Sequence, residues 1–499
     1  MRSHGTLTMI VGVFCALTWL PARSEPAEAG AAPPAPVETD DDQAPAGDAV
    51  EDTEEPFIEP EYIVEKIKIA GNAKTARPVI LNALALDVGE VFSQEAADTS
   101  RLKLLNLGYF TEVELSLAKG SEPGRVVLVV TVDERNTILI DAVDLGLNTN
   151  NPDNPRVFGG LKVTEHSFLG TGVLLSAALA ADDEEQQAYE IEVFTPSVLG
   201  TRLSIGGSLH YSYGREQFRP GMFKPLGEED SELNVRRIGG NLNLGWRWNP
   251  FTGTYVGYRF DALGASGHDQ FFVQPAAADF DSIPDSAADF GVNQGSSYLS
   301  AIVLAMFHDS RNDPFLPTDG GCADLTVELG TRLLGGDYDY TKFTISYEHA
   351  FPTWLDHSIR ADVFLGLIHG RTPYFNKFFR SDLDLSPPKR LLGLDFYRTN
   401  EFGDFAISLG AEYDIPLFST DGPFYRFVAF AAVDATMTGS MAKYFPREDP
   451  TLPADEKTKI DLPIDLTFDV GLKVDTYIGV FRLSVSYFTD RLRVVLHDD

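Results

Sequence analysis

Long hydrophobic runs are missing from this 499-residue chain once its first residues are passed. No later window reaches the roughly eighteen consecutive apolar residues that a membrane-spanning α-helix needs, so a helical membrane protein is excluded. Cysteine is also scarce, since only Cys15 and Cys322 occur. Cys15 lies in an N-terminal stretch that we expect to be removed, so the mature chain cannot form an internal disulfide.

Positively charged residues are also few compared with negatively charged ones. Lysine and arginine number 40 against 74 aspartate and glutamate residues, giving a formal net charge of -34 and a pI of about 4.5. Because binding to a nucleic-acid backbone requires clustered cations, we expect no nucleic acid among the partners.

Sequence motifs typical of catalytic, phosphate-binding and metal-binding sites are missing as well. The sequence has no Gly-x-Ser-x-Gly elbow, no His-Glu-x-x-His pair, no phosphate-binding glycine loop and no Cys/His cluster. His308, Asp309 and Ser310 have the composition of a catalytic triad, but neighbours on a strand point to opposite faces and cannot converge. We therefore predict that the protein is not an enzyme and has no catalytic residues, no cofactor and no metal site.

The N-terminus has the pattern of an export signal. Arg2 and His4 precede the apolar stretch Leu7 to Leu20, and Ala22-Arg23-Ser24 supplies small residues for cleavage. We predict a signal peptide over residues 1–24, with an uncleaved anchor as the alternative.

Residues 25–60 are rich in Ala, Pro, Asp and Glu and nearly devoid of aromatic and β-branched residues. Such a segment buries too little apolar surface to fold by itself. We expect a disordered, extended acidic linker, with an acidic interaction tail as the alternative.

Residues 61–135 have the pattern of a small α+β unit. The first strand ends at the turn pair Gly71-Asn72, and two helical segments follow, one ending at Gly89 and one capped by Ser93. Two further strands complete the order β-α-α-β-β, a three-stranded sheet covered by two helices. This order, the stretch LNLGYFTEV and the final Asp133-Glu134 closely resemble the polypeptide-transport-associated (POTRA) domain.

An open sheet edge is the functional feature that this resemblance implies. An extended client polypeptide can add to such an edge as a further strand, through backbone hydrogen bonds. We expect the edge to be the second strand, because it is short and follows the helices. Its predicted client-binding residues are Val113, Glu114, Leu115, Ser116 and Leu117.

From residue 137 to 499 the chain consists of roughly ten-residue segments in which apolar and polar side chains alternate. One segment shows two alternating sets of residues that face opposite sides. The apolar set is Leu466, Phe468, Val470, Leu472 and Val474, and the other set is Thr467, Asp469, Gly471, Lys473 and Asp475. Such alternation is typical of a wall between lipid and water, with a soluble β-sandwich as the alternative. We count sixteen strands, the last two at 479–488 and 490–497. The predicted fold is an all-β, sixteen-stranded antiparallel transmembrane barrel with one N-terminal POTRA-like domain.

Several stretches of the barrel carry a family resemblance. They are EHSFLGTG at 165–172, FHDSRNDPFLPTDGG at 307–321, ISLGAEYDIPLF at 407–418, FVAFAAVDA at 427–435 and VGLKVDTYIGVFRLSVSY at 470–487. In this order, behind a POTRA-like unit, they resemble the BamA/TamA family of bacterial surface antigen type. Members of that family insert or secrete proteins at the outer membrane.

The loop before the twelfth strand departs from the family pattern. In the family this loop folds into the lumen, and an Arg-Gly-aromatic tip contacts an acidic residue on the thirteenth strand. Here Gly393 is present, but Leu392 and Leu394 replace the arginine and the aromatic residue. Asp434 holds the acidic position, and a buried carboxylate needs a partner or a proton. The nearest substitute cations are Arg390 and Arg398; the alternative is that Asp434 meets only water and other lumen groups.

The two ends of the barrel segment are unusual. The first strand, ILIDAVDLGLN, is poor in aromatic residues, and the chain finishes in His497-Asp498-Asp499 where an aromatic residue is usual. The missing C-terminal aromatic residue weakens the expected folding signal. The first strand is compatible with a weak seam between first and last strands, through which the family is thought to open sideways to clients.

The resemblance implies a factor for outer-membrane protein assembly, insertion or polypeptide translocation. Its barrel would be embedded in the cell outer membrane, with the POTRA-like domain in the periplasm. Its partners would be outer-membrane lipid, unfolded or extended client polypeptides and periplasmic chaperones. The alternative is a passive pore or structural barrel with a vestigial POTRA anchor. A dedicated secretion pore is less favoured, because such pores normally carry two POTRA units and a plug helix.

Overall fold

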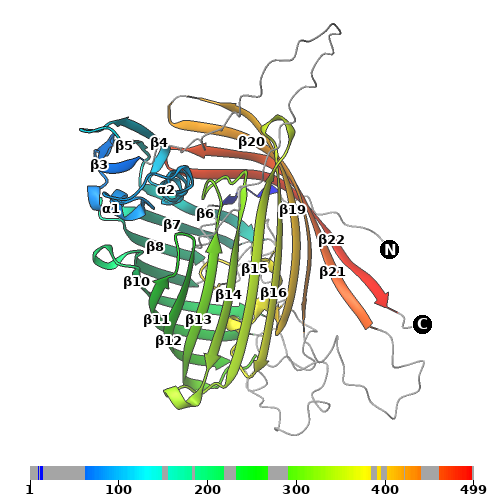
Figure 1. Cartoon of the computed structure of the whole chain (residues 1–499). Helices are drawn as coiled ribbons and strands as arrows, with labels where there is room; N and C mark the ends of the chain where they lie inside the picture. Colours follow the sequence, from blue (N-terminus) through cyan, green and yellow to red (C-terminus); the bar gives the residue numbers. More distant parts are fainter. Residues whose placement is uncertain are drawn as a thin grey trace, which may run out of the picture.

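The computed structural model describes two connected units (Figure 1). The described residues are 9–10, 12–14, 62–148, 156–182, 186–217, 232–267, 290–383, 390–394, 402–420, 422–439 and 460–496. The predicted linker, residues 25–60, lies outside them. None of the helices in these ranges is long and apolar enough to cross a membrane.

The N-terminal unit has the predicted order of elements. They are β3 (Ile63–Ala70), α1 (Arg77–Ala83), α2 (Gln94–Asn106), β4 (Phe110–Lys119) and β5 (Arg125–Glu134). Strand β5 is central, parallel to β3 and antiparallel to β4. The helices pack on the sheet through a core that includes Ile80, Leu104 and Leu128, none of which is exposed. This unit confirms the predicted α+β fold.

The helix boundaries follow local hydrogen bonding. Ser93 caps α2 as predicted, because its side chain accepts a hydrogen bond from the Ala96 N–H. Helix α1 ends at Ala83, well before the predicted end at Gly89. The backbone is extended at Leu84, and the next N–H, of Ala85, donates to Ser100 Oγ at 2.8 Å. A contact with α2 therefore replaces further turns of α1.

The second unit is a nearly closed antiparallel barrel. In the described part of the chain it has fifteen strands: β6 (Ile138–Asn148), β7 (Arg156–Phe168), β8 (Val173–Asp182), β9 (Gln187–Thr195), β10 (Leu203–Gln217), β11 (Glu232–Arg247), β12 (Thr252–Gly267), β13 (Gly295–Asp309), β14 (Gly320–Gly330), β15 (Tyr340–Pro352), β16 (Ser358–Gly370), β19 (Phe405–Ser419), β20 (Phe424–Gly439), β21 (Ile460–Thr476) and β22 (Gly479–Leu496). Each pairs antiparallel with the next, as in β6 with β7 and β21 with β22.

The predicted number of sixteen strands was wrong by one. The two segments at 479–488 and 490–497 form a single strand, β22, which pairs with β21 along its whole length. The pairing shifts from Leu466↔Thr489 to Ile464↔Leu492, so the polar break near Thr489 is a β-bulge and not a turn.

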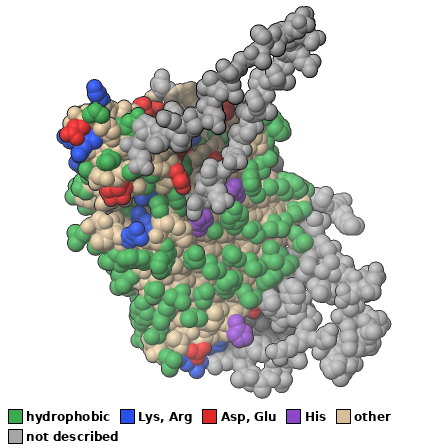
Figure 2. Space-filling model, viewed as in Figure 1, with side chains coloured by type: hydrophobic (Ala, Val, Ile, Leu, Met, Phe, Trp, Pro, Cys, Tyr) green, Lys and Arg blue, Asp and Glu red, His purple; other side chains and the backbone are tan. Residues whose placement is uncertain are grey.

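Side chains along the barrel strands alternate between lipid and lumen as the sequence predicted. In β21, Phe468 and Val470 are 44% and 56% exposed, whereas Thr467 and Asp469 are buried. Figure 2 shows hydrophobic side chains across the visible face of the barrel wall, and exposed large apolar residues occur on strands all along the barrel. The POTRA-like unit lies at the end of the barrel where the short turns are, such as the β21–β22 turn (Figure 1).

The seam lies between the first and last barrel strands. Because fifteen strands alternate in direction, β6 and β22 run the same way, away from the POTRA-like unit. Two short segments, β1 (Met9–Ile10) and β2 (Gly12–Phe14), lie between them. β1 is antiparallel to β22, with Met9 opposite Val485, and β2 is antiparallel to β6, with Val13 opposite Val143. The seam thus has room for one strand that is antiparallel to both of its sides.

Charged side chains in the lumen form ion pairs. Glu412 on β19 has a fully buried side chain that accepts hydrogen bonds from Arg360, Lys473 and Arg482, the last at 2.7 Å. Lys473 also contacts Asp414 at 2.8 Å. Since buried charges are tolerated only when paired, this cluster fixes the inner faces of β16, β19, β21 and β22 against one another.

We predict that Glu412→Gln destabilises the barrel by about 3 to 5 kcal/mol, because it leaves three buried cations short of a partner. The folded band should lose its heat-modifiable gel mobility at a lower temperature than in the wild type. Asp339→Asn is the matched control, since its ion pair with Arg332 is exposed and should contribute under about 1 kcal/mol. Equal melting of the two variants would contradict a structural role for the cluster.

Candidate functional site

The predicted client-binding strand, β4, lies at an edge of the POTRA-like sheet. Val113 is buried, whereas Glu114, Ser116 and Leu117 are exposed and Leu115 is half-buried. The Arg101 Nε donates to the Val113 carbonyl at 3.0 Å, which indicates that this carbonyl points away from β5. By alternation, the backbone groups of Leu115 and Leu117 also face outward. That these residues bind clients stays a prediction.

The opposite edge of the sheet, β3, is partly covered by the chain after α1. The Val64 N–H donates to the Glu90 carbonyl at 2.9 Å, and the Phe92 N–H donates to the Tyr62 carbonyl at 2.7 Å. The start of β3 therefore already has a pairing segment, which leaves β4 as the better edge for strand addition.

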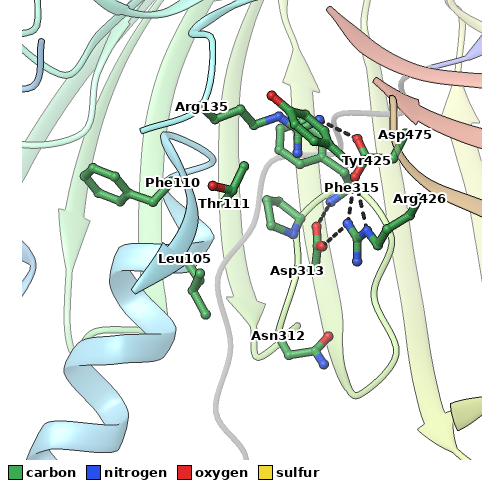
Figure 3. Close-up of a pocket in the computed structure, with 11 residues that line it drawn as sticks. Leu105, Phe110, Thr111, Arg135, Asn312, Asp313, Phe315, Tyr425, Arg426 and Asp475 are labelled. Atoms are coloured by element: carbon green, nitrogen blue, oxygen red, sulfur yellow. Dashed lines mark hydrogen bonds and ion pairs between the residues drawn. The ribbon is translucent and has the colours of Figure 1, made fainter. Parts of the chain in front are cut away.

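A cluster of four ionised residues, the periplasmic clasp, joins the POTRA-like unit to the barrel. It consists of Arg135 after β5, Asp313 in the β13–β14 turn, Arg426 in β20 and Asp475 in β21. Arg135 Nη2 lies 2.5 Å from Asp475 Oδ1 and also donates to the Thr476 carbonyl at 3.2 Å. Arg426 Nη2 bridges Asp475 at 2.9 Å and Asp313 at 2.5 Å. Figure 3 shows this chain of contacts.

Aromatic rings complete the clasp. The Arg135 guanidinium lies 4.3 Å from the centroid of the Phe315 ring and 5.2 Å from that of Tyr425. Such cation–π contacts add to the ion pairs. A cavity of about 240 Å³ adjoins them, and Phe110 and Thr111 at the start of β4 line its other side (Figure 3). The edge strand therefore begins at the cavity beside the clasp.

The motif FHDSRNDPFLPTDGG supplies the turn on which the clasp depends. Asp313 accepts hydrogen bonds from the N–H groups of Phe315 and Leu316, which fixes the turn. Burial by itself raises the pKa of Asp313, but the charge of Arg426 and these N–H groups outweigh it and hold the pKa below its ordinary value. Asp309 and Arg311 of the same motif pair with each other at 2.6 Å.

The clasp lies beside the seam. The Ile140 N–H in β6 donates to the carbonyl of Ile478, in the β21–β22 turn, at 2.7 Å. Arg135 holds the neighbouring residues Asp475 and Thr476. The clasp and this hydrogen bond together join the seam strands at the end nearest the POTRA-like unit.

The loop between β16 and β19 packs in the lumen through its described parts. They include a short helical turn (Tyr374–Asn376), β17 (Phe378–Phe379) and β18 (Phe402–Gly403). Tyr374 and Phe379 pack with Leu233 and Val235 of β11, all four buried. The loop thus has its own apolar core against the inner wall.

The altered tip of this loop forms a two-residue turn. Leu391 and Leu394 exchange backbone hydrogen bonds of 3.0 and 2.9 Å, and the central residues Leu392 and Gly393 both have positive φ. Glycine suits this conformation, whereas leucine adopts it at a cost.

The three leucines of the turn, Leu391, Leu392 and Leu394, form an apolar tip that packs on the lumen face of β7, β8 and β9. Their contacts there are Phe158, Ala180 and Ala188, all buried. Gly160 allows the close approach, because a Cβ built on it would lie 3.0 Å from Leu391 Cδ1. Apolar packing therefore holds the tip where the family resemblance implied an ion pair.

The predicted substitute cations are placed as follows. The Arg390 guanidinium donates to Asp382 at 2.8 Å and lies 3.7 Å from the Phe379 ring centroid. Arg398 lies outside the described residues. Asp434 is fully buried in β20, opposite Gly410 of β19. An Arg398–Asp434 contact stays a prediction.

The clasp is not predicted by any local pattern in the sequence. Arg135 and Asp475 are 340 positions apart, and neither stands out in a local pattern. The sequence carries part of the signal, since Arg135 directly follows the final Asp133-Glu134 of the POTRA-like unit, and Asp313 lies within the motif FHDSRNDPFLPTDGG. Among the described residues, no group of three or more His, Cys, Asp or Glu side chains is arranged to hold a metal ion.

We predict that Leu394→Asp releases the apolar tip, because an ionised carboxylate on an apolar wall costs several kcal/mol. The single-channel conductance of the barrel in a planar bilayer should rise severalfold. Leu333→Asp, in the β14–β15 loop, is the control, since that leucine is 94% exposed. Unchanged conductance in Leu394→Asp would show that the tip does not obstruct the lumen.

The sequence matches two protein-family models. The Omp85 superfamily domain matches residues 167–385, and the POTRA model, described as surface antigen variable number repeat, matches residues 62–135.

Curated proteins similar to the chain include two that are named outer membrane protein assembly factor BamA. The one from Neorickettsia risticii is 23% identical over 332 residues, which cover 64% of this chain and 40% of that protein. The one from Nitratidesulfovibrio vulgaris is 24% identical over 344 residues, which cover 66% of this chain and 39% of that protein. The chain thus spans about two fifths of the length of these relatives.

Among solved structures, CdiB from Escherichia coli is similar, with a TM-score of 0.54 and 13% identity. The match covers 88% of this chain and 75% of that one. At this identity the likeness concerns the fold, which is the barrel with its N-terminal unit. The family matches and the barrel lead to one conclusion: the chain carries an Omp85 superfamily domain and, ahead of its barrel, a POTRA domain.

Proposed function

We propose that this protein inserts other polypeptides into the outer membrane or translocates them across it. In this proposal the POTRA edge strand β4 receives an extended client, and the seam between β6 and β22 accepts one of its strands. The observation that carries the proposal is the seam itself, which holds two short segments, β1 antiparallel to β22 and β2 antiparallel to β6.

The protein lies in the outer membrane, with the POTRA domain in the periplasm. The barrel strands expose an apolar belt, and the family is one of outer-membrane proteins (Figure 2). In the hydrocarbon region every backbone N–H and C=O needs a partner within the protein. The facing edges of β6 and β22 therefore favour any strand that satisfies them.

The segment now in the seam supports a role for incoming strands. Residues 9–10 and 12–14 belong to the stretch that we expect to be removed on export, and their backbones pair with β22 and with β6, respectively. Backbone pairing is independent of sequence, so different clients can use the same seam. We propose that removal of this stretch leaves the position to a client strand.

The clasp supports a route from the POTRA domain to the seam. Phe110 and Thr111, at the start of β4, line the cavity beside Arg135 and Asp475. The same Asp475 precedes the β21–β22 turn, whose Ile478 carbonyl accepts a hydrogen bond from Ile140 in β6. A client that extends β4 at this end would arrive next to the seam.

The proposed function makes and breaks no covalent bonds, so we propose that the protein is not an enzyme. Periplasmic chaperones would deliver the clients. A passive pore is disfavoured by the packing of the lumen loop, whose apolar tip and apolar core occupy the inside of the barrel.

We predict that Leu115→Pro impairs client engagement, because proline removes an outward N–H from the edge of β4. Crosslinking of an unfolded outer-membrane client to the POTRA domain should fall at least fivefold, while the barrel still inserts. Leu115→Ala keeps the N–H and shortens the same side chain, so it should engage clients nearly as well as the wild type. If both variants lose crosslinking equally, the side chain and not the edge is responsible.

The seam is tested by cysteines at its two sides. Val143→Cys in β6 and Val485→Cys in β22 lie opposite the segment that occupies the seam. Val485 lies opposite Met9 and Val143 opposite Val13, four residues apart, so two stalled clients are used, each with one cysteine, at strand positions four residues apart. Each client cysteine should form a disulfide with one of the two sites. Val363→Cys, a lipid-facing position on β16, is the control and should give none. Client crosslinks equally frequent at Val363 would rule out entry through the seam.

A further inference from the structure

A second cavity, of about 150 Å³, lies between the POTRA helices and the periplasmic mouth of the barrel. Lys103, Asn106 and Tyr109 of the POTRA domain line one side, and His166, Arg247 and Phe251 of the barrel line the other. None of these residues belongs to the clasp or to the predicted edge.

The barrel side of this cavity faces inward. Trp246 is 45% exposed on the lipid side of β11, so the next residue, Arg247, points to the opposite, lumen side. His166 in β7 is buried, with 6% of its surface exposed. A polypeptide passing the periplasmic mouth can reach this side of the wall, whereas membrane lipid cannot.

The cavity has an excess of positive charge. Lys103 and Arg247 both line it, and the one carboxylate in its lining, Asp309, is held by Arg311 through hydrogen bonds of 2.6 and 2.7 Å. Burial, followed by the charges of Arg247 and Arg202, lowers the pKa of Lys103 to about 8. The cavity is therefore locally positive, although the chain as a whole has a net charge of -34.

Two polar groups in the wall have no hydrogen-bond partner among the described residues. They are His166 Nε2 and Asn106 Oδ1, both buried. A buried polar group without a partner destabilises the fold, and a ligand that supplies a partner recovers this free energy. The imidazole and the amide can both donate to an anion, since either end of an amide can face the cavity.

We propose that this cavity binds a carboxylate that a client polypeptide carries next to an apolar side chain. Lys103 and Arg247 supply the charge, and His166 and Asn106 supply the unpaired polar groups. The remaining wall, which includes Leu107, Leu174 and Phe251, is apolar and suits the neighbouring side chain. The inference rests on the proposed function and names the chemistry of the client segment that lies at the mouth.

The test uses the full chain in detergent micelles and two fluorescent ten-residue strand peptides. One peptide contains a single Phe-Asp pair, and the other has Phe-Asn at the same place. Anisotropy titration should give a Kd at least tenfold lower for the Phe-Asp peptide, because hydrogen bonds to charged groups contribute about 1.5 to 3 kcal/mol when shielded from water. Lys103→Gln with Arg247→Gln should abolish this difference.

Lys66→Gln is the control variant, since Lys66 is exposed on β3. It should leave the tenfold difference intact. Arg247→Lys keeps the charge and should retain most of the preference, which separates a binding role from a folding defect. Mass spectrometry of Lys103 after acetylation at pH 8 gives a second readout, and the Phe-Asp peptide should protect this amine.

Equal Kd values for the two peptides would overturn the proposal. So would displacement of the Phe-Asp peptide by inorganic phosphate at millimolar concentration, which would make the cavity a site for small anions. Protection of Lys103 by phosphatidylglycerol vesicles and not by the peptide would assign it to lipid. If client crosslinks to Val143 and Val485 persist in any of these cases, the proposed function stands and only the cavity's role fails.

Discussion

Every strand of a barrel in lipid must find hydrogen-bond partners along both of its edges, and the arrangement of this protein depends on how that constraint is met at the seam. Fourteen successive antiparallel pairings carry the described barrel from β6 to β22 and leave these two strands running in the same direction. An all-antiparallel closure then needs one more strand between them. In the structure β1 (Met9–Ile10) and β2 (Gly12–Phe14) hold that position.

The ion pairs in the lumen and the clasp stabilise the barrel around the seam. Glu412 and its three cations tie the inner faces of β16, β19, β21 and β22, while the clasp joins the POTRA domain to the turns nearest the seam. The apolar tip stabilises the opposite wall of the lumen, because it packs on β7, β8 and β9. The seam strands are thus fixed at the periplasmic end and supported from inside, while their facing edges stay suited to backbone pairing.

Much of this architecture is predictable from local sequence patterns. The order of elements in the POTRA domain, the cap at Ser93 and the alternation in β21 all follow from spacing that one segment displays by itself. The strand count failed because Thr489 and Asp490 look like a turn in sequence, and only pairing with Leu466 shows that the strand continues through a bulge. The contacts of the candidate site are harder to predict from the sequence. Arg135 meets Asp475 across 340 positions, and the apolar tip finds Phe158 on a distant strand, so neither contact has a local signal.

The central claim is that the seam between β6 and β22 carries clients into the membrane. The most direct measurement is the rate at which a urea-unfolded outer-membrane barrel gains heat-modifiable mobility in liposomes that contain the mature protein. The comparison is with the same protein after a bifunctional reagent with a span of about 16 Å has bridged cysteines at Val143 and Val485, which are offset by four residues across one strand width. Insertion should run well above the rate in empty liposomes and should return to that rate once the seam is bridged. Insertion that stays fast with the seam bridged would contradict it.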